Sequence, residues 1–475
     1  MARVILVNPA IYDFAAFDLW ARPLGLLYLA ASLENHGHEV RIVDALSRFH
    51  PSVAGVRGKY GPRRRRYGTG AYFWREAEKP ACYSHIPRIY KRFGLPEEAL
   101  GRELAAGPRP DVVGVTSGMT YWYLGAAEAV RIVRDIFPGA PVVLGGTYAT
   151  LCADHATSAV RPDYVVSGPG EGEMLRLVAR LAGGRAAEKD APFAELPNPA
   201  YHLLPRFESA SVLTGRGCPF RCAYCASKIL APKLERRRPA AVVDEIESYR
   251  ARFGVIDVAF FDDALLWDAD GHAKIIFEEI ARRGLGMRFH TPNGLHSRYV
   301  DAEAARLMKA AGFATIRLSL ETIAPKRESD SDHKVKYEDF LRAVGHLRAA
   351  GFTSEGMGAY VLIGLPGEST GEAARNIAAA HAAGVAVRLA HFSPIPGTEY
   401  FEKARAAAGI DLSEPLMHNN TIVPAGGPGA YEKYEELKDL AAALNGELRK
   451  GRVVLSMRDV EKDPAAALED MRLSK

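Results

Sequence analysis

The first part of the chain alternates short apolar runs with longer segments whose apolar residues recur at helical spacing. A buried parallel strand is apolar on both faces and reaches the next strand through a crossover, usually a helix. The alternation therefore predicts a doubly wound parallel sheet, a Rossmann-like α/β domain over residues 1–190 with an insertion at 47–107. The predicted strands are residues 3–8, 39–44, 111–116, 140–146 and 163–168, and the predicted helices are 23–36, 124–137 and a segment from Glu171.

A second series of strands and helices follows. The helical segments tend to end in glycine, as helix C-termini prefer. Six strand–helix units predict a partial (β/α)6 barrel of the TIM type over residues 206–400, whose chemistry belongs at the carboxyl ends of its strands. The predicted strands are residues 211–214, 257–261, 287–290, 315–320, 357–363 and 385–392, and the terminal glycines are Gly254, Gly284, Gly312, Gly351 and Gly384.

Residues 191–205 contain several prolines, which predicts a linker between the two domains. Residues 401–475 form a small C-terminal helical extension in this interpretation. It contains an amphipathic helix from Tyr431 to about Lys450 and a polar helical tail over residues 463–475.

The insertion combines Arg57, Lys59 and the four arginines 63–66 with many aromatic residues. Such charge runs are usually solvated surface. The alternative is an anionic site, because guanidinium groups bind carboxylates and phosphates and aromatic rings can grip an extended chain or a base. Since the segment is too long for a simple loop, we expect a lid or a substrate-specific cap.

The net charge of +4 over 475 residues is small, so it gives no support for a nucleic-acid or membrane partner. No apolar run is long enough for a signal peptide or a membrane span. Few, unpaired cysteines predict a reducing cytoplasm. The expected partners are a small-molecule or peptide substrate, possibly an anionic one, rather than a nucleic acid or a membrane.

Three of the five cysteines, Cys218, Cys222 and Cys225, fall within eight residues on a Gly- and Pro-containing loop after the first barrel strand. Three converging thiolates predict an iron–sulfur cluster with one iron left open. A structural zinc site is the alternative, but it needs a fourth ligand and usually shows paired spacings. Cys82 and Cys152 stand alone, and we expect them to be free thiols.

The spacing Cys-x-x-x-Cys-x-x-Cys, with Tyr224 before the last cysteine, resembles the cluster loop of the radical S-adenosylmethionine enzymes. The resemblance implies a [4Fe–4S] cluster whose open iron chelates S-adenosylmethionine, and reductive cleavage to a 5′-deoxyadenosyl radical. Strand ends of the barrel are similar to the family's S-adenosylmethionine contacts, although Asp262-Asp263 stand where Gly-Gly-Glu is common. The implied contacts are Tyr224, Asp262, Asp263, Ser319, Glu321 and Gly364.

The first domain has no Gly-x-Gly-x-x-Gly after its first strand and no Gly-Lys-Ser loop, so nucleotide motifs are lacking. Glycine-rich strand ends would let a flat ring approach the backbone closely. This domain resembles the cobalamin-binding domain that precedes the cluster domain in one subgroup of the radical family. The implied cobalamin contacts are Asn8, Ser117, Gly118, Gly145, Gly146, Thr147, Gly168, Gly170 and Glu171.

The loop Asp-x-His-x-x-Gly, which supplies a histidine to cobalt in many cobalamin proteins, is absent. We therefore expect no histidine beneath cobalt. The alternative is a degenerate sheet that only shapes a substrate cavity or an interface, since a fold does not imply a ligand.

The resemblance implies a cobalamin-dependent radical S-adenosylmethionine methyltransferase that acts on an unactivated carbon, with a flavodoxin or ferredoxin-type electron donor. Cyclisation or rearrangement without methyl transfer stays open. A methylthiotransferase would normally carry three further cysteines and an RNA-binding module. A non-enzymatic cobalamin or redox sensor would predict a DNA-binding or partner domain; neither kind of addition is visible in the sequence.

Overall fold

The computed structural model describes residues 1–183, 189–324, 327, 336–408, 411–425 and 429–455. The chain divides into two compact units. The first contains Met1–Ser211, Ile229–Arg237 and Ser413–Met417, and the second contains Val212–Lys228, Arg238–Leu412 and His418–Lys475. The predicted tail over residues 463–475 lies outside the described residues.

The first unit is built on a parallel sheet with the strand order β11-β10-β9-β1-β4. The first strand pairs with the second and third strands of the sheet on its two sides. This order reverses direction between β1 and β9, which is where doubly wound sheets bind ligands. The strands are β1 (Arg3–Asn8), β4 (Glu39–Asp44), β9 (Val112–Ser117), β10 (Val142–Gly146) and β11 (Tyr164–Val165).

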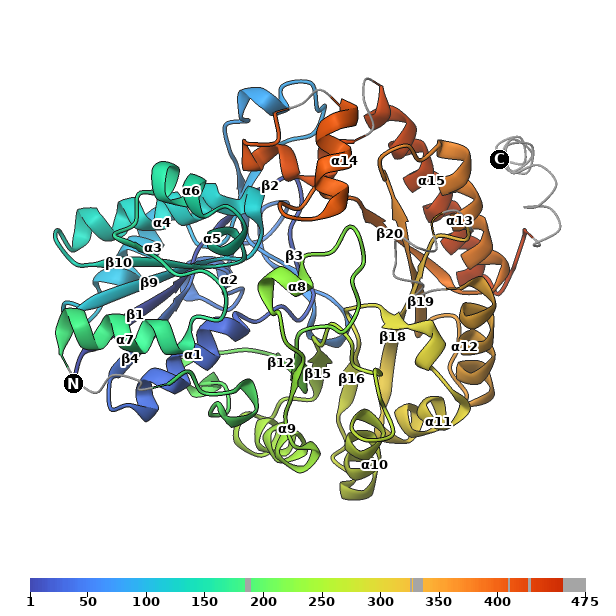
Figure 1. Cartoon of the computed structure of the whole chain (residues 1–475), viewed down its shortest axis with the longest axis horizontal. Coiled ribbons are helices and arrows are strands. Elements are labelled where there is room, and N and C mark those ends of the chain that lie inside the picture. Colours follow the sequence, from blue (N-terminus) through green and yellow to red (C-terminus); the bar gives the residue numbers. More distant parts are fainter. Residues whose placement is uncertain (184–188, 325–326, 328–335, 409–410, 426–428, 456–475) are drawn as a thin grey trace. The chain divides into compact units, whose positions relative to one another are not determined.

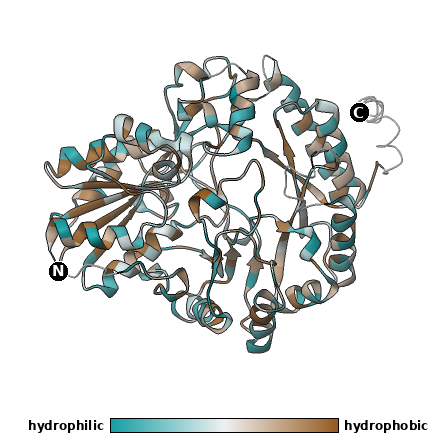
Figure 2. Cartoon of the chain, viewed as in Figure 1, coloured by the Kyte–Doolittle hydropathy of each residue, from teal (hydrophilic) through white to brown (hydrophobic). Residues whose placement is uncertain are grey.

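Helices cover both faces of this sheet (Figure 1), with α1 and α7 on one face and α3 and α4 on the other. The strands are predominantly apolar while the helices mix apolar and polar residues (Figure 2), as expected for a sheet buried on both sides. The helices are α1 (Leu24–Asn35), α2 (Pro51–Ala54), α3 (Glu97–Ala105), α4 (Tyr123–Ile136), α5 (Thr147–Leu151), α6 (Ala153–His155) and α7 (Glu171–Ala182).

Much of the insertion forms two small antiparallel sheets with the segment that follows β1. One sheet joins β2 (Ile11–Asp13), β8 (Lys91–Phe93) and β7 (Trp74–Glu76). The other joins β3 (Phe17–Asp18), β6 (Gly70–Ala71) and β5 (Arg63–Arg64). The insertion therefore pairs with the segment that follows the carboxyl end of β1.

The second unit is built on a sheet with the order β12-β15-β16-β18-β19-β20, with short β17 also beside β18. The strand pairs from β15 to β20 are all parallel. The expected partial barrel is confirmed. Its strands are β12 (Ser209–Val212), β15 (Asp257–Phe260), β16 (Arg288–His290), β17 (Leu295–His296), β18 (Phe313–Glu321), β19 (Met357–Ile363) and β20 (Ala386–His391).

Helices line the outer face of the barrel sheet (Figure 1). Three of them end in a left-handed glycine, Gly254, Gly284 and Gly312, as the sequence predicts. The long helix α15 packs against β20, where the Asn445 side chain bonds both backbone groups of Val387. The helices are α9 (Pro239–Phe253), α10 (Ala273–Arg283), α11 (Ala302–Ala311), α12 (Tyr337–Ala349), α13 (Thr370–Ala382), α14 (Glu399–Ala408) and α15 (Ala430–Arg449).

The region after residue 400 is not one extension. Ser413–Met417 belongs to the first unit, where the Tyr83 hydroxyl donates to the Leu416 carbonyl (2.6 Å). Helices α14 and α15 belong to the second unit. Among the helices that the structure describes, none combines the length and apolar character needed to cross a bilayer.

Candidate cluster and cofactor sites

The three cysteines lie on the loop that follows the first barrel strand, and none of them forms a disulfide. Cys218 is buried, Cys222 is half-buried and Cys225 is exposed. The loop turns tightly, because the Cys225 amide donates to the Cys222 carbonyl (3.0 Å). The Tyr400 amide donates to the Ala223 carbonyl (3.0 Å) and ties the loop to the start of α14.

Asp262, which follows β15, fixes the start of this loop. Its Oδ1 accepts hydrogen bonds from the Thr214 amide (2.9 Å), the Thr214 hydroxyl (2.6 Å) and the Gly215 amide (2.7 Å). Its other oxygen, Oδ2, is buried without a hydrogen-bond partner. Burial raises the pKa of this carboxyl to about 6, although the three donors act against that rise.

The donor set fits an iron–sulfur cluster. Cys218, Cys222 and Cys225 bring three thiols onto one short loop. Thiolates are the ligands of [4Fe–4S] clusters, and three of them leave one iron open. A structural zinc site would need a fourth protein ligand.

Aromatic side chains pack beside the cluster loop. The Phe220 ring lies edge-on to the His296 ring, with centroids 4.3 Å apart, and also to the Trp267 ring at 5.5 Å. Trp267 in turn contacts Tyr299 at 5.6 Å. Because Phe220 belongs to the cluster loop, this packing anchors the loop to two other segments of the barrel. Sequence reasoning missed this packing, because its rings come from separate segments of the chain.

Tyr224 and Glu321 come together although they are far apart in the sequence. Burial, followed by the neighbouring Glu321 carboxylate, raises the pKa of Tyr224 well above its ordinary value. Glu321 ends β18 with a left-handed backbone, φ 58°, beside a register shift in the pairing with β19. Such strained non-glycine residues cluster at functional sites.

The other predicted S-adenosylmethionine contacts lie at strand ends of the same barrel. Ser319 is buried, and a Cβ added to Gly294 would lie 2.5 Å from its hydroxyl. Gly364 has φ +83°, and its amide donates to Glu368 Oε2 (2.7 Å). Burial raises the pKa of Glu368 to about 7. Asp263 is exposed.

A cavity of about 370 Å³ opens in the first unit at the switch point of its sheet. Asn8 at the end of β1 and Ser117 and Gly118 at the end of β9 line it. The volume falls within the ~300–1,000 Å³ typical of small-molecule sites. The remaining lining residues are mostly apolar and include Ala10, Ala16, Phe17, Leu24, Leu46, Tyr72 and Trp122, with Arg22 as the charged member.

The other predicted cobalamin contacts do not line this cavity, although some lie beside it. A Cβ on Gly146 would lie 2.6 Å from the Ser117 carbonyl, so the turn before Thr147 needs glycine there. The Thr150 hydroxyl donates to the Gly146 carbonyl (2.9 Å) and accepts from the Gly168 amide (2.9 Å). The neighbouring predicted contacts are Gly145 at the end of β10, and Gly170 and Glu171 at the start of α7.

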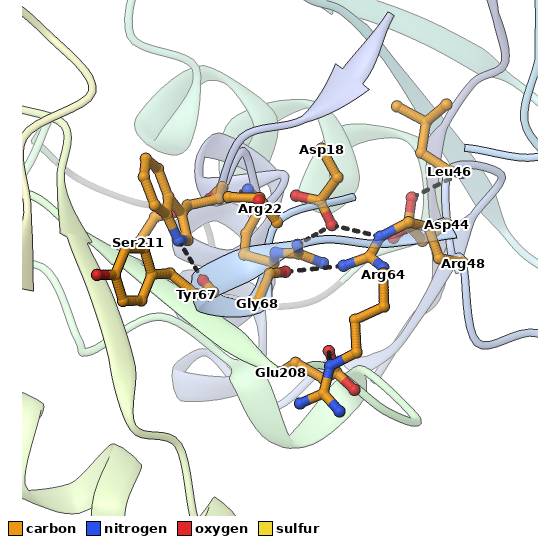
Figure 3. A network of polar contacts seen from close by, with 12 residues as sticks. Asp18, Arg22, Asp44, Leu46, Arg48, Arg64, Tyr67, Gly68, Glu208 and Ser211 are labelled. Atoms are coloured by element: carbon orange, nitrogen blue, oxygen red, sulfur yellow. Dashed lines mark hydrogen bonds and ion pairs between the residues drawn. The ribbon is translucent and has the colours of Figure 1, made fainter. Parts of the chain in front are cut away.

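Buried charged side chains form a network that includes Arg22, the charged residue of the cavity lining (Figure 3). The Asp18 carboxylate binds both Arg22 and Arg48, the latter at 2.9 Å, and Arg48 also donates to the Gly68 carbonyl (2.8 Å). The Asn8 amide donates to Asp44 (2.7 Å). Sequence reasoning missed this network, because its members come from four separate segments.

The arginine run of the insertion lies on the surface. Arg64 pairs with Glu208 (3.0 Å), and Arg65 and Arg66 stack on the rings of Phe17 and Tyr67. Arg63 to Arg66 are all exposed. The contacts favour the solvated-face interpretation of the run over the anionic-site interpretation.

Two family models match the chain in the order expected for these sites. The model of the radical SAM superfamily matches residues 212–380, and the model of the B12 binding domain matches residues 95–178. The chain belongs to the radical S-adenosylmethionine superfamily. As a cobalamin-dependent member, it uses a [4Fe–4S] cluster, S-adenosylmethionine and cobalamin.

Several of the relatives with assigned names are methyltransferases, and one is a cyclase. An uncharacterised methyltransferase of Pyrococcus horikoshii is 25% identical over 417 residues, covering 81% of this chain and 78% of the relative. The cytidylyl-2-hydroxyethylphosphonate methyltransferase of Streptomyces wedmorensis is 24% identical over 521 residues, covering 95% and 90%.

Among solved structures, the radical S-adenosylmethionine methyltransferase TsrM of Kitasatospora setae, with cobalamin and a [4Fe–4S] cluster, superposes with a TM-score of 0.64. The identity is 19%, and the match covers 94% of this chain and 89% of that one. This likeness is one of fold.

Proposed function

We propose that this protein transfers a methyl group to an unactivated carbon of a small-molecule or peptide substrate. The observation that carries the proposal is the combination in one chain of a three-cysteine loop at the first barrel strand and a B12-binding match in the first unit. The relatives named as methyltransferases support the same reaction.

When bound, the cluster supplies the electron that splits S-adenosylmethionine, and cobalamin carries the methyl group. The chain's own part is to bind, orient and exclude water. Cys218, Cys222 and Cys225 would hold the cluster. Asp262 would keep the loop in place through Thr214 and Gly215.

The strand ends would hold S-adenosylmethionine. The Glu321 carboxylate is suited to an ammonium group or to ribose hydroxyls. Tyr224 beside it and Ser319, two residues earlier on β18, would complete that side, and the Asp263 carboxylate follows the end of β15. The turn at Gly364, fixed by Glu368, brings backbone close to the same edge.

In the first unit, Asn8, Ser117 and Gly118 would contact cobalamin at the switch point. The cavity lining includes no histidine. Cobalt without a histidine ligand stays a prediction, which the electronic spectrum of the bound cobalamin can test.

The reaction needs a reductant, and we propose a flavodoxin or ferredoxin-type protein as its source. None of the five cysteines, all of which lie in the described residues, forms a disulfide. Reduced thiols and a reducible cluster suit the cytoplasm, where we place the protein.

The test is an assay of anaerobically purified, cluster-reconstituted protein with S-adenosylmethionine, cobalamin and a low-potential reductant. We expect both 5′-deoxyadenosine and S-adenosylhomocysteine by mass spectrometry, and we expect Cys222→Ala to abolish the first product. Cys152→Ala, which removes a half-buried thiol outside the loop, is the matched control and should retain it.

Deoxyadenosine without cobalamin-dependent S-adenosylhomocysteine would contradict methyl transfer and favour a rearrangement. Zinc in place of iron, or an active Cys222→Ala protein, would contradict the radical mechanism itself.

A further inference from the structure

Two arginines lie on the inner face of the barrel on strands that flank β19. Arg317 of β18 pairs in register with Gly358, and Arg388 of β20 pairs with Tyr360. Side chains alternate along a strand, and the buried neighbours Ile316 and Leu318 face the covering helices. Arg317 and Arg388 therefore face the opposite side, toward the barrel interior.

A glycine brings the two side chains together. A Cβ on Gly358 would lie 3.2 Å from both Cδ and Nη1 of Arg317 and 3.2 Å from Cγ of Arg388. Both arginines thus lie across the same bare stretch of β19 backbone. A side chain at this position would separate them or push them aside.

No carboxylate of the described residues pairs with either arginine. Among the described residues, the Arg317 side chain makes one hydrogen bond, from Nη1 to the adjacent Ile316 carbonyl (3.1 Å). The carboxylate of Asp257 is engaged by Arg288 through two bonds of 2.7 Å and by His290 at 3.0 Å. Arg317 is half-buried and Arg388 is exposed, so a ligand can reach them.

The arrangement costs stability in the absence of a ligand. Burial and then the charge of Arg388 lower the pKa of Arg317 to about 10. Elsewhere in the chain, buried arginines such as Arg48 and Arg92 are paired with carboxylates. Two guanidinium groups side by side are well suited to a planar or tetrahedral oxyanion, which they can bind through several parallel hydrogen bonds.

We propose that Arg317 and Arg388 form an oxyanion site inside the barrel that binds a carboxylate or phosphate group of the substrate. The assignment of the anion to the substrate rests on the proposed function. The oxyanion site itself does not, because it follows from the register and from the unpaired charges.

The first test uses inorganic phosphate and the full-length, cluster-loaded protein. Thermal unfolding is followed under anaerobic conditions as phosphate replaces chloride at constant ionic strength. We expect phosphate to raise the Tm of the wild type. Arg388→Gln and Arg317→Gln should each weaken phosphate binding at least about tenfold, since a hydrogen bond to a charged group contributes that much.

The control is Arg282→Gln, because Arg282 is exposed and pairs with Glu279 on its own helix. It should respond to phosphate as the wild type does. Without phosphate, Arg388→Gln should unfold no earlier than the wild type, because it removes a repulsion. An equal phosphate response in all four proteins, or a lowered Tm of Arg388→Gln in chloride, would overturn the oxyanion site.

The second test separates the substrate from S-adenosylmethionine, whose own carboxylate has the same chemistry. The phosphate titration is repeated with saturating S-adenosylmethionine, and its affinity is measured by equilibrium dialysis. Phosphate stabilisation that persists, with unchanged S-adenosylmethionine affinity in Arg388→Gln, supports a substrate anion. Competition, together with a tenfold weaker affinity in Arg388→Gln, overturns that assignment. Failure of methyl transfer would appear only in the product assay, so the two proposals fail separately.

Discussion

Buried charged side chains of the first unit form ion pairs close to its ligand cavity. Asp18 and Arg48 are almost fully buried, with side chains about 1% and 3% exposed. A buried ion pair adds little net stability, but removing one partner leaves an uncompensated charge in a poorly solvated site. Removing one partner should therefore lower the stability more than the pair as a whole contributes.

Arg48→Ala should lower the free energy of unfolding by about 3–5 kcal/mol, because it leaves Asp18 with Arg22 alone and the Gly68 carbonyl without its donor. Chemical denaturation measures this loss. Arg65→Ala, in an exposed neighbour of the same insertion, should change stability by less than about 0.5 kcal/mol. Equal effects of the two substitutions would show that the buried network has no special role.

Asp262 gives the barrel a stability that depends on pH. Its pKa is raised from an ordinary value of 3.8 to about 6 by burial. Between these values the folded protein binds a proton that the unfolded chain does not, so the free energy of unfolding falls as pH rises. Asp262→Asn keeps an acceptor oxygen for Thr214 and loses the titration.

From pH about 4 to about 6, the stability of Asp262→Asn relative to the wild type should therefore rise by about 2 kcal/mol, out of about 3 kcal/mol for the whole titration. Anaerobic denaturation of both proteins across this range measures the difference. Parallel pH profiles would contradict the role assigned to Asp262.

At the scale of elements, glycine allows α4 to approach the loop after β1. A Cβ on Gly125 would lie 1.8 Å from the Ala10 carbonyl oxygen and 2.8 Å from its carbon. Backbone cannot yield as a flexible side chain can. Because Ala10 lines the cavity, the spacing of this helix also shapes the ligand site.

Gly125→Ala should destabilise the protein by about 1–3 kcal/mol and weaken its retention of cobalamin, since either α4 or the Ala10 loop must shift. Unfolding curves and cobalamin absorbance per chain after gel filtration measure the two effects. Gly101→Ala is the control: it lies on α3, where a new Cβ would meet Ile136 and Ile132 at 3.8 and 3.9 Å, ordinary contact distances. Unimpaired cobalamin retention in Gly125→Ala would contradict the placement of the ligand.

At the scale of the whole molecule, the two cofactor chemistries belong to separate compact units. The cluster cysteines lie in the second unit, and the switch-point cavity lies in the first. Loss of one cofactor should therefore leave the other bound.

Cys222→Ala should lose iron and deoxyadenosine formation while retaining cobalamin at the wild-type ratio. Gly125→Ala should show the converse, with full iron content and reduced cobalamin. Metal analysis and visible spectra of the two purified variants test this. Loss of both cofactors in either variant would contradict the independence of the sites.

The sequence by itself determined the features that depend on a few consecutive residues. Apolar runs such as residues 357–363 predicted their strands to the residue, and glycine placement predicted the ends of α9, α10 and α11. The spacing of the three cysteines indicated the cluster and its family. These features depend on backbone preference and burial over a few residues, which the local sequence fixes.

Only the tertiary structure decided what depends on register and on contacts between distant segments. It assigned Asp262 to the cluster loop, placed Tyr224 beside Glu321 and brought Arg317 and Arg388 across Gly358. The sequence instead directed attention to the arginine run of the insertion, which is solvated. Packing across the whole sheet decides which face of a strand is buried and which strand it pairs with. No local pattern could therefore show which arginines would share a site without a carboxylate.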